Sequence, residues 1–78
     1  MRHRVRLPPL GDGVETATVL EWACQVGESV AVGQPLMSVE LDKIDTEVPA
    51  PVDGTLVERA VAEGDEVRVG DVICLVES

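Results

Sequence analysis

The sequence has almost no aromatic residues: its 78 residues include one tryptophan and no phenylalanine or tyrosine. Valine takes their place, with fifteen copies. Side chains branched at Cβ are stiff at χ1 and pack well on pleated sheets. No segment has an apolar periodicity of about 3.6 residues that is long enough for a helix. Together these features predict an all-β fold.

Positive charge is also scarce, because six Lys and Arg residues stand against fifteen Asp and Glu, a formal net charge of −9. Nucleic acids and anionic membranes both attract surfaces rich in Lys and Arg. We therefore expect no nucleic acid and no membrane as a partner. The N-terminal residues 1–6 are basic, but no long apolar run follows them, so we expect no signal peptide and no membrane span.

Groups that carry catalysis or bind metals are few. Cys24 and Cys74 lie in apolar runs, which predicts two buried free thiols rather than a disulfide. His3 is the only histidine, and no Cys/His spacing fits a metal site. No Ser/His/Asp or Cys/His set is available for nucleophilic catalysis. We expect no metal site and no active site within this chain.

An internal repeat organises what is present. When the sequence is shifted by 37 positions, residues 27–33 (GESVAVG) align with residues 64–70 (GDEVRVG). The aligned units cover about 15–41 and 52–78, within one expected domain of residues 1–78. Two copies of one supersecondary unit predict a closed pair related by a pseudo-two-fold axis.

Glycine-rich turn signals divide each unit into short strands. The expected strands are Val5–Leu7, Thr16–Trp22, Val30–Val32, Leu36–Leu41, Asp45–Val48, Thr55–Val61, Val67–Val69 and Val72–Val76. Many short, closely spaced strands are typical of a small sandwich or barrel. Residues 49–51 (PAP) lack ladder donors and are expected to cross between the halves.

The repeat breaks after Glu40, where the first unit continues and the second one stops. The continuation predicts a hairpin with a tight turn at Asp42-Lys43, for which we expect a type I geometry. Lys43 is the only lysine, so only one side-chain amine of the chain can be acylated. The ordinary alternative is a solvated turn lysine without a function.

The whole chain resembles the biotinyl/lipoyl attachment domains, in particular the lipoyl domains of the acyltransferase subunits of 2-oxoacid dehydrogenase complexes. The matching stretches are residues 7–13 (LPPLGDG), Glu21-Trp22, residues 26–28 (VGE), residues 40–43 (ELDK), and residues 47–51 (EVPAP) followed by Gly54. Leu41 departs from the pattern, because the family more often has Thr or Ser at this position.

The resemblance implies a flattened barrel of two four-stranded antiparallel sheets, with the hairpin at one end and both termini at the other. It implies that Lys43 is amide-linked to lipoate, either by a lipoate ligase or by octanoyl transfer and sulfur insertion. Glu40 and Asp42 fall where the family carries acids that guide these enzymes. Biotinyl members usually have Met on both sides of the lysine, so Asp42 and Ile44 favour lipoate over biotin.

The resemblance also implies partners. Gly11 and Asp12 belong to a loop expected beside the hairpin, where it contributes to recognition by a thiamine-diphosphate 2-oxoacid decarboxylase. The other expected partners are an acyltransferase catalytic domain, which transfers the acyl group to coenzyme A, and a dihydrolipoyl dehydrogenase. The isolated domain is expected to be a monomer. A bacterial protein of this kind would be cytoplasmic, and a eukaryotic one would lie in the mitochondrial matrix.

Three alternatives remain open at this point. The chain could be a biotinyl carrier domain of a carboxylase, or a non-carrier barrel with an unmodified Lys43. It could also be a free-standing acyl carrier in a specialised pathway, rather than a non-catalytic part of a dihydrolipoamide acyltransferase subunit. Trp22 is expected to be a core or sheet-face residue rather than a binding platform.

Overall fold

The computed structural model describes residues 1–42 and 44–78, and this part of the chain forms eight strands. The strands are β1 (Arg2–Arg6), β2 (Thr16–Trp22), β3 (Ser29–Val30), β4 (Pro35–Leu41), β5 (Ile44–Pro49), β6 (Gly54–Arg59), β7 (Glu66–Arg68) and β8 (Val72–Glu77). No helix occurs in these ranges, and hence none that could span a membrane. The predicted all-β fold is confirmed.

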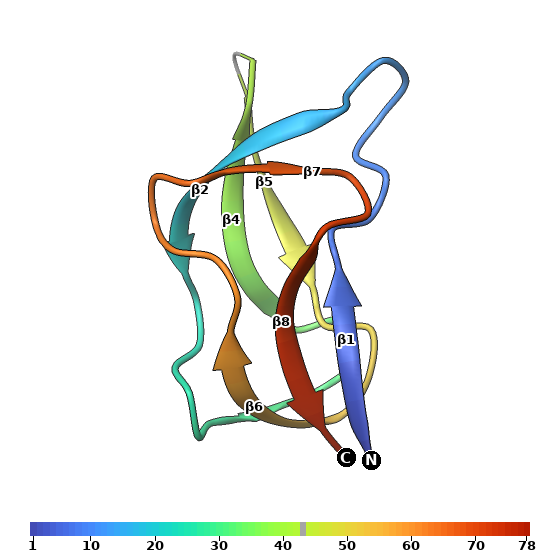
Figure 1. Cartoon of the computed structure of the whole chain (residues 1–78), viewed down its shortest axis with the longest axis vertical. Helices are drawn as coiled ribbons and strands as arrows, with labels where there is room; N and C mark the ends of the chain where they lie inside the picture. Colours follow the sequence, from blue (N-terminus) through green and yellow to red (C-terminus); the bar gives the residue numbers. More distant parts are fainter. Residues whose placement is uncertain (43) are drawn as a thin grey trace.

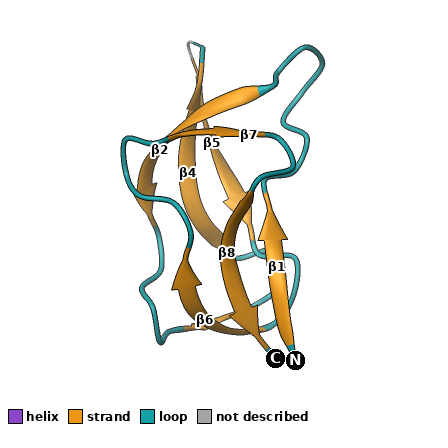
Figure 2. Ribbon diagram, in the orientation of Figure 1, coloured by secondary structure: helices purple, strands orange, loops and turns teal. Residues whose placement is uncertain are grey.

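The strands form two four-stranded sheets with the orders β1-β8-β6-β3 and β5-β4-β2-β7. All neighbouring strands are antiparallel. The two sheets face each other as a flattened barrel, with β4 and β5 projecting at one end and both chain termini at the other (Figures 1 and 2). The expected sheets, and the expected separation of hairpin and termini, are confirmed.

Strand boundaries differ from the expected ones mainly where side chains close turns. The strands expected at residues 30–32 and 67–69 are instead β3 and β7, each ending one or two residues earlier. The side chain of Gln34 accepts a hydrogen bond from Ala31 N at 3.2 Å, and that of Asp71 accepts one from Arg68 N at 2.9 Å. These local bonds compete with the sheet ladder and turn the chain early.

The pseudo-two-fold axis relates each strand of one sheet to a strand of the other sheet. Adding four to each strand number converts β1, β2, β3 and β4 into β5, β6, β7 and β8, and this operation maps one sheet order onto the other. Backbone hydrogen bonds follow the same rule: Gly27 N donates to Leu56 O and Gly64 N donates to Val19 O, both at 2.7 Å. The sequence repeat of 37 residues thus has a structural counterpart in β2, β3 and β4, which correspond to β6, β7 and β8.

The core consists of one inward-facing layer from each sheet. Residues at matching repeat positions, such as Leu36 with Ile73 and Val39 with Val76, are fully buried. Every buried residue in the described ranges is hydrophobic, and no polar side chain lies among them. A core filled in this way leaves the surface, and above all the projecting hairpin, to carry a function.

Candidate functional site

The candidate site is the hairpin formed by β4 and β5. Glu40 pairs with Asp45 and Leu41 pairs with Ile44, so the ladder continues to within one residue of the turn on each side. The turn is therefore a two-residue connection, Asp42-Lys43. Lys43 itself, the predicted attachment residue, lies outside the described residues.

The backbone of Asp42 corrects the expected turn type. Its φ is 47°, in the left-handed region, whereas a type I turn requires a negative φ at this position. A two-residue hairpin loop favours the primed turns, because their twist matches that of the flanking strands and types I and II would splay them. Aspartate tolerates the left-handed region better than most residues because its short carboxylate can bond local backbone groups. The predicted type I turn was therefore wrong.

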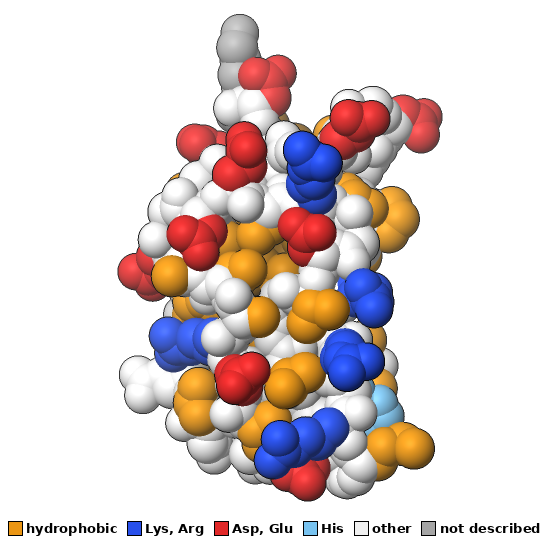
Figure 3. Space-filling model, in the orientation of Figure 1, with side chains coloured by type: hydrophobic (Ala, Val, Ile, Leu, Met, Phe, Trp, Pro, Cys, Tyr) orange, Lys and Arg blue, Asp and Glu red, His pale blue; other side chains and the backbone are white. Residues whose placement is uncertain are grey.

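Exposed side chains surround the turn on both strands. Ile44 is 64% exposed, and Glu40, Asp42 and Asp45 are also exposed, whereas Leu41 is buried at 5% exposure. Leu41 thus ties the base of the turn to the core while its neighbours face solvent. On the face drawn in Figure 3, acidic side chains crowd this end of the molecule. A group carried at the turn is held away from the core and within a negative surface.

Residues just before β2 face the base of the hairpin across a hollow, but of the loop expected there, residues 11–13, only Gly13 does so. A surface hollow of about 230 Å³ is lined by Gly13, Val14, Glu15 and Thr16 on one side and by Leu41 and Asp42 on the other. Gly11 and Asp12 are exposed and do not line this hollow. Gly11 instead closes the loop, because its carbonyl accepts a hydrogen bond from Val14 N at 3.2 Å.

Val14 and Leu41 line this hollow, although neither was predicted as a site residue. Val14 packs on the core, and Leu41 belongs to it. Leu41 is buried at 5% exposure, so a leucine at this position packs into the core. The sequence signal for each was an apolar residue directly beside a turn-forming segment: Val14 follows residues 11–13, and Leu41 precedes Asp42.

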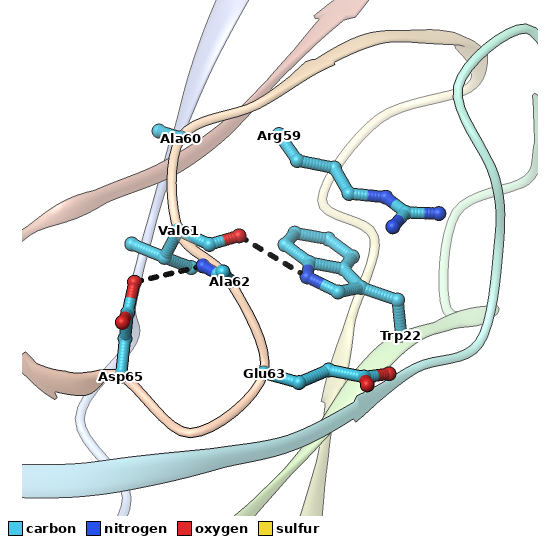
Figure 4. Close-up of a pocket in the computed structure, with 7 residues that line it drawn as sticks. All are labelled: Trp22, Arg59, Ala60, Val61, Ala62, Glu63 and Asp65. Carbon is cyan, nitrogen blue, oxygen red and sulfur yellow. Dashed lines mark hydrogen bonds between the residues drawn. The ribbon is translucent and has the colours of Figure 1, made fainter.

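A second surface hollow, beside Trp22, is formed by residues whose contacts stabilise the fold. It is lined by Trp22, Arg59 and the loop between β6 and β7 (Figure 4). The indole Nε1 donates to Val61 O at 3.2 Å, and the Arg59 guanidinium lies over the ring. The half-buried Trp22 packs on the core and fastens this loop, in agreement with its expected role as a sheet-face residue.

Both cysteines are buried free thiols, as predicted. Burial raises the pKa of the Cys74 thiol to about 12, with a smaller contribution from the neighbouring Cys24. Burial also raises the pKa of Cys24, as does Glu28, while Arg59 opposes the shift. Since the thiolate is the reactive form, neither residue is a nucleophile at neutral pH.

An all-β barrel of two halves related by a pseudo-two-fold axis, with one hairpin projecting from the end opposite the termini, is the fold of the cofactor-attachment domains that the sequence resembles. The family model described as "Biotin-requiring enzyme" matches residues 3–77. The chain therefore belongs to the biotinyl/lipoyl attachment family.

Curated relatives indicate the branch of this family. The chain is 42% identical over 76 residues to the dihydrolipoyllysine-residue acetyltransferase component of the pyruvate dehydrogenase complex of Corynebacterium glutamicum, covering 97% of the chain and 11% of the relative. It is 44% identical over 78 residues to the dihydrolipoyllysine-residue succinyltransferase component of the 2-oxoglutarate dehydrogenase complex of Bartonella vinsonii, covering 100% of the chain and 19% of the relative. The chain thus corresponds to the lipoyl-bearing part of acyltransferase components, and it spans less than a fifth of their length.

Solved structures agree with this assignment. The lipoyl domain of the 2-oxoglutarate dehydrogenase complex from Azotobacter vinelandii superposes with a TM-score of 0.73 at 28% identity, covering 95% of this chain and 94% of that one. The urea carboxylase of Kluyveromyces lactis superposes with a TM-score of 0.82 at 19% identity, covering 99% of this chain and 6% of that one. The second similarity shows the fold alone, so the lipoyl domain is the informative neighbour.

Proposed function

We propose that this chain is a non-catalytic carrier domain, in which Lys43 bears lipoate through an amide bond. The observation that carries this proposal is the position of the only lysine in the sequence, at a two-residue connection beside the exposed acidic residues Glu40, Asp42 and Asp45. Lipoate ligation requires an accessible amine, and the β4–β5 ladder, which continues to Leu41 and Ile44, gives this position in the chain a rigid support. The relatives named as dihydrolipoyllysine-residue acyltransferase components support the choice of lipoate.

The residues at the turn fit this group. Ile44 and Asp42 flank the lysine with exposed side chains, so no described side chain blocks the approach of a modifying enzyme on either flank. When bound, lipoate supplies a dithiolane that accepts an acyl group and two electrons. The protein supplies position and identity, as is usual for a bound cofactor.

Glu40 and Asp42 are proposed to guide the lipoate ligase or octanoyl transferase to Lys43. Both are exposed and lie within three residues of the lysine, so a basic surface on the enzyme can contact them together. Gly11 and Asp12, in the loop beside the hairpin, are proposed to contribute to recognition by the decarboxylase. This loop is fixed by core contacts of Leu10 and Val14, so its exposed tip has a defined place relative to the turn.

The proposed partners are a 2-oxoacid decarboxylase, an acyltransferase catalytic domain and a dihydrolipoyl dehydrogenase. A long lysine arm on a rigid hairpin reaches several such sites in turn. If the carrier is tethered to a larger assembly, its effective concentration at each site is raised without any new contact. The hairpin end and the termini lie at opposite ends of the barrel, so a tether would leave the turn free (Figure 1).

The test is the intact mass of the purified chain after incubation with a lipoate ligase and, in parallel, with a biotin ligase. We expect one lipoyl adduct on Lys43, located by peptide mapping, and no biotin. Lys43→Arg keeps the charge and should abolish the adduct while the circular dichroism spectrum stays unchanged. A biotin adduct would move the chain to the carboxylase branch, and an adduct surviving in Lys43→Arg would overturn the site.

A further inference from the structure

The pseudo-two-fold relation makes β1 and β5 equivalent strands, although their sequences give no such indication. Leu7 N donates to Asp71 O and Ala50 N donates to Gln34 O, and Asp71 and Gln34 are themselves 37 residues apart. A shift of 43 residues therefore superposes β1 on β5. Each strand occupies the edge of its sheet in the described part of the chain.

These two equivalent edges carry opposite charges. Arg2, Arg4 and Arg6 alternate along β1 and are all exposed. Asp45 and Glu47 take the matching exposed positions on β5. An edge strand offers unpaired backbone groups to any other strand, and cross-strand pairs of opposite charge stabilise such pairing while like charges oppose it. The charges therefore disfavour β1 against β1 or β5 against β5, and favour β1 against β5.

The lengths of β1 and β5 also allow them to pair as antiparallel strands. In an antiparallel register with Arg4 opposite Glu47, Arg6 lies opposite Asp45, and all five residues of β1 face residues 45–49. The inward positions then also match, because Val5 meets Thr46 across the ladder. In Figure 1 both strands lie at the same side of the barrel, one in each sheet, and their arrows point in opposite directions. A two-fold axis along this side would join both pairs of edges at once.

We propose that the flank formed by β1 and β5 is a self-association surface, on which β1 of one copy pairs antiparallel with β5 of a second copy and the reverse. The resulting dimer is isologous and extends each sheet from four to eight strands across the two-fold axis. Arg4 is the central cation of this contact, because the other two arginines have partners within their own chain. Arg2 Nε lies 3.8 Å from Glu77 Oε2, and Arg6 Nη1 donates to Gly70 O at 2.9 Å. Pro49 supplies no donor, which shortens the ladder at one end.

The proposed dimer is expected to have a low association constant. The paired strands are short, and two copies of net charge −9 repel each other at long range. At about 0.15 M salt the Debye length is about 8 Å, so this long-range repulsion is screened while ion pairs in contact are affected less. The monomer is accordingly the state at micromolar concentration, and association is expected at about 1 mM, a concentration that tethered copies reach.

The experiment is sedimentation equilibrium from about 10 μM to 2 mM at about 0.15 M salt. The weight-average mass of the unmodified protein should rise from 8.3 kDa toward twice that value. Arg4→Glu and Glu47→Arg should each lower the association constant by about 10-fold, because each places like charges at both contacts of the dimer. Arg68→Glu and Glu21→Arg change the net charge equally at exposed sites outside β1 and β5, and should have a smaller effect.

The decisive sample is a mixture of Arg4→Glu with Glu47→Arg. In the mixed dimer both contacts again join opposite charges, so association should return to the level of the unmodified protein. A mass that stays at 8.3 kDa up to 2 mM would overturn the proposal. So would a mixture that associates no better than either variant alone. Neither outcome bears on the lipoylation of Lys43, which is measured separately.

Discussion

Trp22 and Arg59 occupy the same position in the two repeats, 37 residues apart, and they stack on each other across the pseudo-two-fold axis, with Arg59 Cζ 5.3 Å from the centroid of the indole ring. Each also donates to a backbone carbonyl of the opposite repeat: Trp22 Nε1 to Val61 O at 3.2 Å, and Arg59 Nη2 to Cys24 O at 3.3 Å. Cys24 and Val61 are again 37 residues apart. Two different side chains thus make one symmetric brace between β2 and β6, which lie in different sheets.

This brace predicts that Trp22→Phe destabilises the protein by about 1 kcal/mol, because the ring is largely kept but Val61 O loses its donor. Trp22→Ala should cost about 2 kcal/mol or more, since the packing on the core and the cation–π contact are lost as well. Denaturant unfolding followed by circular dichroism measures both, because Trp22 is the only fluorophore of note. Equal stability of Trp22→Phe and the unmodified protein would contradict the role of the indole N–H.

Gly54 permits the close approach of β6 and β8. A Cβ built at this position would lie 2.4 Å from the backbone oxygen of Glu77, which cannot move without breaking the β6–β8 ladder. Gly54→Ala should therefore destabilise the fold by about 3 kcal/mol. Gly33→Ala is the control: its Cβ would meet nothing within 4 Å, and the φ of 87° alone should cost about 1 kcal/mol. A smaller loss for Gly54→Ala than for Gly33→Ala in thermal unfolding would refute this explanation.

Substitutions at Asp42 distinguish the effect of its backbone conformation on stability from the effect of its carboxylate on lipoylation. Because φ is 47°, Asp42→Gly should keep or slightly raise stability, whereas Asp42→Val should lose about 1 kcal/mol. If the carboxylate guides the lipoate ligase, Asp42→Gly will fold normally and yet be lipoylated more slowly. Thermal unfolding and the initial rate of adduct formation, measured on the same samples, distinguish the two effects. Unchanged lipoylation of Asp42→Gly would remove Asp42 from the proposed recognition residues.

Cys74 predicts a loss of stability at high pH. Its folded-state pKa is about 12, above the value of 9.0 expected for an unfolded cysteine, so only the unfolded chain ionises between these values. The free energy of unfolding should therefore be independent of this group below pH 9 and fall as the pH rises toward 12, by up to about 1.4 kcal/mol per pH unit. Cys74→Ala should lower stability at neutral pH but flatten this slope. Parallel pH profiles for the two proteins would contradict the assignment to Cys74.

Several features could be predicted from local sequence because local physics fixes them. β2 was predicted at its observed bounds, Thr16–Trp22, because apolar residues at Ala17 and Val19 alternate with polar ones between clear turns. The pairing of two similar units and the hairpin after Glu40 followed from the repeat and its interruption, whereas the two four-stranded sheets were implied by the family resemblance. Lys43 could be named as the candidate attachment residue because it is the only lysine of the chain.

Other features were beyond local sequence. The type I turn was a wrong prediction at Asp42, because the twist of the paired strands, not the residue preference, selects the turn. β1 was expected to begin at Val5, but it begins at Arg2, because pairing with Glu77 at the far end of the chain extends it. Neither partner carries a sequence signal for the other.

The class of fold, the duplication and the position of the single lysine could be read from the chain alone, since β-branched composition, repeated turn signals and a unique lysine are local properties. Which distant residues meet became evident only in the folded protein. It put Trp22 against Arg59, and it made β1 and β5 equivalent edges of opposite charge despite their dissimilar sequences. Those relations depend on how the pseudo-two-fold axis relates the strands of one sheet to those of the other. This arrangement forms only when the two sheets bury their apolar faces against each other.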